Sequence, residues 1–110
     1  MSARARLQLV LPVALGRQQP VMLSSLFHET ARLAFAMGEL ADAAALTGAV
    51  TRLADRPEVT LATFITEQAR ELGGGLVSSL GRDEAERLMQ GGVALDAAAT
   101  FEIVRRCLGG

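Results

Sequence analysis

Residues 23–53 read LSSLFHETARLAFAMGELADAAALTGAVTRL, and this stretch decides the fold. On each side of Gly38, apolar residues recur at steps of three and four, the spacing of a helix that buries one face. The first run consists of Leu23, Leu26, Phe27, Thr30, Leu33, Ala34 and Met37, and the second of Leu40, Ala43, Ala44, Thr47, Val50 and Leu53. Because Gly38 leaves only a short turn, we expect the two helices to lie antiparallel as a hairpin.

The composition extends this expectation to the rest of the chain. Half of the 110 residues are hydrophobic, with four Phe, no Tyr and no Trp. Alanine and leucine dominate the apolar residues, which favours closely packed helices over a β-sandwich. A chain of this length forms one domain that buries roughly 65% of its unfolded surface. The predicted fold class is therefore all-α.

The predicted domain covers residues 20–110, with a repeat-like hairpin at 20–57 and capping helices at 58–108. Pro20 suits a first helical position, and the second hairpin helix should stop around Asp55 to Pro57. Residues 1–19 are predicted to be a lead-in segment, a short helix or extended. The reason is Pro12, which should interrupt any helix from Ala3 to Leu15.

The next helical stretch should start near Val59 or Thr60, and its centre is Gly73 to Gly75. Each glycine inside a helix costs about 1 kcal/mol relative to alanine. Either the helix continues through the glycines or it stops at Leu72 and another begins. We favour a continuous helix, because the leucine spacing stays in phase across the triplet.

Two further helices are predicted after Gly81. Asp83 and Glu86 form a capping-box pattern at the start of the first, and Gly91 and Gly92 should close it. Asp96 can cap the last helix. The apolar face of that helix consists of Ala97, Phe101, Val104 and Leu108, and it ends with Arg105 and Arg106, which suit a helix C-terminus.

Residues 24–57 resemble a 34-residue tetratricopeptide unit, with small residues at Ala31, Gly38 and Ala43 where its helices pack closely. A longer resemblance, over roughly residues 20–108, is to the C-terminal helical-repeat region of actinobacterial LuxR-type and AfsR-type regulators. It is carried by ARLAFAMGELADAAALTGAVTRL and by LGRDEAERLMQGGVALDAAATFEIV. Residues 1–19 do not match it.

The resemblance implies only the interaction or sensing segment of such a regulator. A nucleotide-binding loop needs a lysine, and all eleven basic residues are arginine. A basic helix-turn-helix is absent from the sequence, and the formal net charge of −1 argues against direct nucleic-acid binding.

The residues capable of chemistry do not form a site in the sequence. A single Cys107 and a single His28 allow neither an internal disulfide nor a metal set. Ser25 lies three residues before His28, but an orienting acid and an oxyanion hole are lacking, so we expect a structural histidine. We expect Cys107 to be a small hydrophobic residue, although Arg105 and Arg106 beside it would lower the pKa of its thiol.

The acidic pairs and the glycine triplet are also interpreted structurally. Glu67 with Glu71, and Glu84 with Glu86, are expected to be solvated surface charge. Gly73 to Gly75 lack the preceding strand and the adjacent cation of a phosphate cradle. We therefore expect no catalytic, cofactor-binding or metal site and no cofactor.

The sequence predicts a non-enzymatic helical-repeat module that binds protein, as a homodimer or by docking onto a larger partner. The alternative is a small-molecule sensor with an apolar pocket lined by Leu, Met and Phe. The N-terminal run MSARARLQLVLPVALG contains Gln8 and Pro12, lacks a clear cleavage site and is too short to span a membrane. We expect a cytoplasmic protein.

Overall fold

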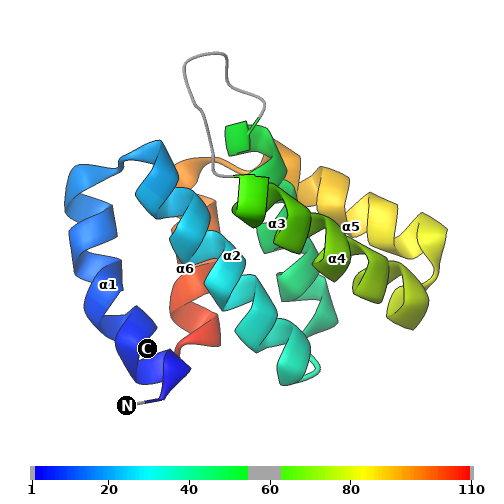
Figure 1. Ribbon diagram of the computed structural model, residues 1–110, viewed down its shortest axis with the longest axis horizontal. Coiled ribbons are helices and arrows are strands. Elements are labelled where there is room, and N and C mark those ends of the chain that lie inside the picture. The colour runs from blue at the N-terminus through cyan, green and yellow to red at the C-terminus, as the bar shows by residue number, and fades with distance from the viewer. Residues whose placement is uncertain (1, 55–62, 110) are drawn as a thin grey trace.

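The structure, a computed structural model, describes residues 2–54 and 63–109. Within these residues it contains six helices and no strand, which confirms the all-α prediction (Figure 1). The predicted helix end around Asp55 to Pro57 and the predicted start near Val59 or Thr60 lie outside the described residues. The helices are α1 (Ala3–Arg17), α2 (Pro20–Ala36), α3 (Leu40–Ala54), α4 (Thr63–Leu80), α5 (Arg82–Ala94) and α6 (Ala97–Cys107).

Helices α2 and α3 contact each other along their lengths and run in opposite directions (Figure 1). Pro20 occupies the first turn of α2, as its missing N–H allows, and Gly38 turns the chain with φ 82°. Most of the predicted apolar faces are buried, but Met37 is exposed. The tetratricopeptide-like character of residues 20–57 stays a prediction.

The crossing of α3 and α5 brings two helix backbones together at Gly48 and Gly92. A Cβ atom at Gly48 would lie closer than 3.0 Å to the carbonyl oxygen of Met89, and one at Gly92 equally close to that of Ala45. The prediction that Gly91 and Gly92 close α5 is wrong, because α5 continues to Ala94. Gly92 serves close packing against α3 instead of terminating the helix.

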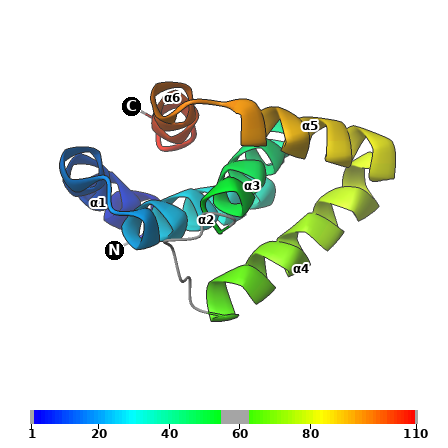
Figure 2. The ribbon, with the colours of Figure 1, turned by 90° about the horizontal axis from the view of Figure 1, so that it is seen from above.

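Helix α4 is continuous through Gly73 to Gly75, as predicted. It lies on the side of the molecule away from α1 and contacts α2, α3 and α5 (Figure 2). Leu76 is fully buried, and Leu72 and Leu80 pack against the core. Tertiary packing of these leucines therefore offsets the low helix propensity of the glycines.

The prediction that Asp83 caps α5 is wrong. The N-cap is Gly81, whose φ of 87° turns the chain between α4 and α5 within one residue. Helix α5 therefore starts at Arg82, and Asp83 lies in its first turn, where a negative charge favours the helix dipole. Glu86 pairs with Arg82 at 3.5 Å instead of closing a capping box.

Helix α6 packs against α2 and α3. The Asp96 cap is confirmed, because its Oδ1 accepts a hydrogen bond from the Ala99 backbone N–H at 2.8 Å. Phe101 meets Phe27 of α2 edge to face with ring centroids 5.7 Å apart. Val104 and Leu108 are buried, whereas Ala97 is exposed.

Residues 3–17 form one uninterrupted helix, so the expectation that Pro12 breaks it is wrong. Pro12 lies on the exposed side of α1, where water can satisfy the carbonyl that loses its partner. On the other side, Leu7 and Ala14 are buried against the rest of the fold. This packing and the Ser2 side chain, which accepts a hydrogen bond from the Ala5 N–H, hold the helix together.

Candidate interaction surface

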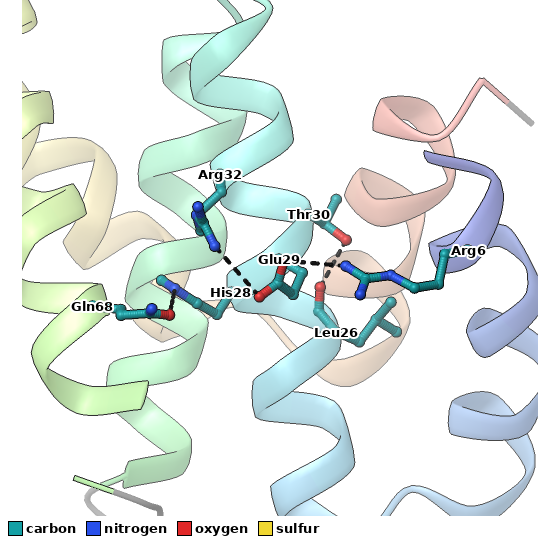
Figure 3. Close-up of polar contacts among 7 residues, drawn as sticks. All are labelled: Arg6, Leu26, His28, Glu29, Thr30, Arg32 and Gln68. Carbon is teal, nitrogen blue, oxygen red and sulfur yellow. Dashed lines mark hydrogen bonds and ion pairs between the residues drawn. The ribbon is translucent and has the colours of Figure 1, made fainter. Parts of the chain in front are cut away.

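His28 is a buried link between α2 and α4. Its side chain points toward Gln68, and its Nε2 lies 3.1 Å from the Gln68 Oε1 (Figure 3). The residue is only 3% exposed, and this burial lowers the pKa of the imidazole. Ser25 is exposed, and the imidazole's hydrogen-bond partner is the amide of Gln68. The geometry is that of a neutral structural histidine.

Cys107 is buried, and its thiol has low reactivity. The residue is 5% exposed, and burial, with the nearby Asp42 carboxylate, raises the pKa of its thiol to about 11. Arg106 acts in the opposite direction, but its guanidinium is paired with Asp42. The thiol therefore stays protonated at neutral pH and is a weak nucleophile.

The four glutamates of the two acidic pairs, Glu67, Glu71, Glu84 and Glu86, are exposed. Glu67 and Glu71 are exposed on α4, and Glu84 forms an exposed ion pair with Arg87. Across residues 2–54 and 63–109, no three His, Cys, Asp or Glu residues gather into a potential metal site.

The most unusual surface lies on α1. Leu9, Pro12, Val13 and Gly16 follow the spacing i, i+3, i+4, i+7, which is that of a helix face buried against a partner. All four are exposed, Leu9 by 64% and Val13 by 47%. We call these four residues the outer stripe. Because the opposite side of α1 is also apolar and is packed against the core, α1 has two apolar faces and only one is covered.

A groove between α1 and α6 lies beside the outer stripe. It consists of two clefts of about 260 and 420 Å³, and Arg105 lines both. Leu11 and Leu108 contribute to the first cleft, and Leu15 and Phe101 to the second. We call this the α1–α6 groove. On the α1 surface, Pro12 of the outer stripe is one turn from Leu15, so the stripe and the groove are neighbours.

Charge is distributed unevenly over the molecule. Helix α1 contains Arg4, Arg6 and Arg17 and no acidic residue. Helices α4 and α5 together contain five acidic residues and three arginines, and they lie on the side away from α1 in both views (Figures 1 and 2). Helix α1 is therefore basic, whereas α4 and α5 together carry a net negative charge.

This surface was not predicted, because Pro12 was expected to interrupt a helix in residues 1–19. The i, i+3, i+4, i+7 pattern of the outer stripe was nevertheless present in the sequence.

No protein-family profile, no curated protein and no solved structure matches the chain. Among the described residues, no helix combines the length and the apolar character that crossing a membrane requires.

Proposed function

We propose that this chain is a non-enzymatic helical module that binds another protein, and that its binding surface is the outer stripe of α1. The observation that carries the proposal is the second apolar face of α1. A helix face made of apolar residues at this spacing is normally buried against a partner. The exposure of Leu9 and Val13 therefore points to a partner that covers them.

The free energy available from this surface is useful but moderate. Complete burial of an exposed leucine or valine side chain contributes about 1.5–3 kcal/mol. Leu9 is 64% exposed and Val13 is 47% exposed, so a large part of each side chain is available for burial. Their burial would thus change the dissociation constant by at least about tenfold.

The charge of α1 favours a different protein over a second copy of this chain. A symmetric dimer across the outer stripe would bring Arg6 and Arg17 of both copies together with no acidic residue on either α1. Like charges across an interface oppose association. Light scattering should accordingly show that the isolated chain does not dimerise through α1.

Photo-crosslinking in the producing cells tests this proposal. With p-benzoylphenylalanine in place of Val13, we expect one discrete protein adduct, which is lost when Leu9→Glu is added. The matched control places the same residue at Gln90, which is exposed on α5. Absence of a specific adduct at position 13, or equal adducts at both positions, would contradict the proposal.

The assignment to a transcriptional regulator is a proposal that rests on the sequence resemblance alone. It predicts that an ATPase reading frame lies immediately upstream in the genome and runs into this one. An unrelated upstream gene would count against it.

A second candidate function is binding of a small apolar molecule in the α1–α6 groove. The observation that favours it is Arg105, which lines both clefts. Its guanidinium pairs with Glu102 at 2.6 Å and has further N–H donors that could bind the carboxylate of a ligand. Thermal unfolding with a series of fatty acids tests it. A rise in Tm that disappears in Arg105→Gln would support this candidate, and an unchanged Tm throughout the series would exclude it.

A further inference from the structure

We infer that the partner of the outer stripe is an amphipathic helix that carries acidic residues at both ends of its apolar face. This inference rests on the proposed function and names the chemistry of its partner. Three features of α1 support it, namely the shape of the stripe, the placement of the arginines and the neighbouring groove.

The outer stripe has the dimensions of one helix contact. Helix α1 has 15 residues and is therefore about 22 Å long. From Leu9 to Gly16 the stripe contains no charged residue, and Gly16 leaves room for a backbone to approach. Aliphatic side chains at this spacing match the anchors of a second helix laid alongside.

Arginines mark both ends of the stripe. Arg6 and Arg17 are eleven positions apart, which is three helical turns, so they lie along the same edge about 16 Å from each other. Arg4 does not contribute to this edge, because its guanidinium points toward Met37 of α2. A partner helix therefore matches α1 best with acidic residues about eleven positions apart on either side of an aliphatic centre.

Arg6 remains able to bind a second carboxylate. It points toward Glu29 of α2 at 3.6 Å, and its side chain is 60% exposed (Figure 3). An exposed pair of this kind holds its partners weakly. The guanidinium has five N–H donors, so it can contact Glu29 and an acidic residue of the partner together.

The α1–α6 groove favours a helix over an anionic membrane surface. Both would satisfy the arginines, but the groove is hollowed beside the stripe, with Leu15, Phe101 and the Glu102–Arg105 ion pair in its wall. A bilayer surface would leave this hollow unfilled, whereas side chains of a helix can pack into it.

Two labelled 18-residue helical peptides test the inference. Both carry the same leucine stripe, and they differ only in two end positions eleven residues apart, which are Glu in one and Lys in the other. By fluorescence anisotropy at low salt, we expect the full-length chain to bind the Glu peptide at least tenfold more tightly. The difference should shrink as salt rises, because these charges are exposed.

Exchange of charge between protein and peptide provides the control. In Arg17→Glu, the Glu peptide should bind about tenfold more weakly and the Lys peptide more tightly than to the wild type. Arg70→Glu makes the same change on the exposed surface of α4 and should leave both affinities unchanged. If Arg17→Glu leaves the preference for the Glu peptide over the Lys peptide unchanged, the inference is wrong.

The remaining outcomes separate the inference from the proposed function. Equal binding of both peptides, abolished by Leu9→Glu, would overturn the acidic partner and support the outer stripe as a binding surface. Binding to phosphatidylserine vesicles instead of either peptide would overturn both. If neither peptide binds, the inference fails, and crosslinking at position 13 decides the proposed function independently.

Discussion

Two regions of this molecule contain glycines inside helices, and they use them in opposite ways. At the crossing of α3 and α5, Gly48 and Gly92 each lie against the backbone of the other helix. In α4, added Cβ atoms at Gly73 and Gly74 would meet nothing within 4 Å. Glycine lowers helix propensity in both regions. At the α3–α5 crossing this cost is offset because glycine allows the two helices to pack closely, whereas at Gly73 and Gly74 no close contact requires glycine.

The largest effect is expected at the crossing. Gly92→Ala would place a methyl group against the Ala45 carbonyl, so the helices must separate, and we expect a loss of about 3 kcal/mol or more in the free energy of unfolding. Urea denaturation measures this. Gly91→Ala is the matched control, because nothing lies within 4 Å of that position. Similar effects of the two substitutions would show that the crossing is not tightly packed.

The next effect is a pH dependence of stability that arises from His28, whose side chain contacts Gln68 and so joins α2 to α4. Burial lowers the pKa of His28 below its ordinary 6.5, so the unfolded chain binds more protons near and below that pH. The free energy of unfolding should therefore fall as the pH drops below about 6.5, the ordinary histidine pKa. The charged groups that act on the imidazole are Glu29, which opposes the lowering, and Arg32, which adds to it.

Denaturation at pH 7.5 and at pH 5.5 measures this dependence. His28→Gln is the control, because it keeps a polar side chain but cannot titrate near this pH. Equal pH dependence in the wild type and in His28→Gln would show that His28 does not contribute.

A smaller effect of opposite sign is expected in the glycine triplet. Gly74→Ala should stabilise the protein by up to about 1 kcal/mol, because alanine has the higher helix propensity and its methyl group would project into open space. Thermal and urea unfolding both report it. Destabilisation by this substitution would mean that Gly74 has a structural role that its surroundings do not show.

The smallest change is expected at Gly75, the one glycine of the triplet near another side chain. Its added Cβ would lie 3.2 Å from the Phe35 ring, so the gain in helix propensity is opposed by a small shift of that ring. We expect a net change within about 0.5 kcal/mol of zero. A large loss in the free energy of unfolding would show that Gly75, like Gly92, is tightly packed.

The parts of the fold that depend on local pattern were predictable. The helical class, the buried face of α2, the Asp96 cap and the continuity of α4 follow from apolar spacing and capping chemistry, which act within a few residues. The same local rules gave wrong predictions for Asp83, Pro12 and Gly92. Asp83 is not the cap because Gly81 is the N-cap of α5. Pro12 does not end α1 because it lies on the exposed side, where water can bind the carbonyl that loses its partner. Gly92 does not end α5 because it packs against the backbone of α3.

The candidate site divides in the same way. The sequence by itself determined that residues 3–17 contain three arginines, no acidic residue and apolar residues at helical spacing. Only the tertiary structure decided that Leu7 faces the core while Leu9 faces solvent. Periodicity places side chains on a helix face, but which faces are covered depends on contacts between segments far apart in the chain, and no local pattern encodes those contacts.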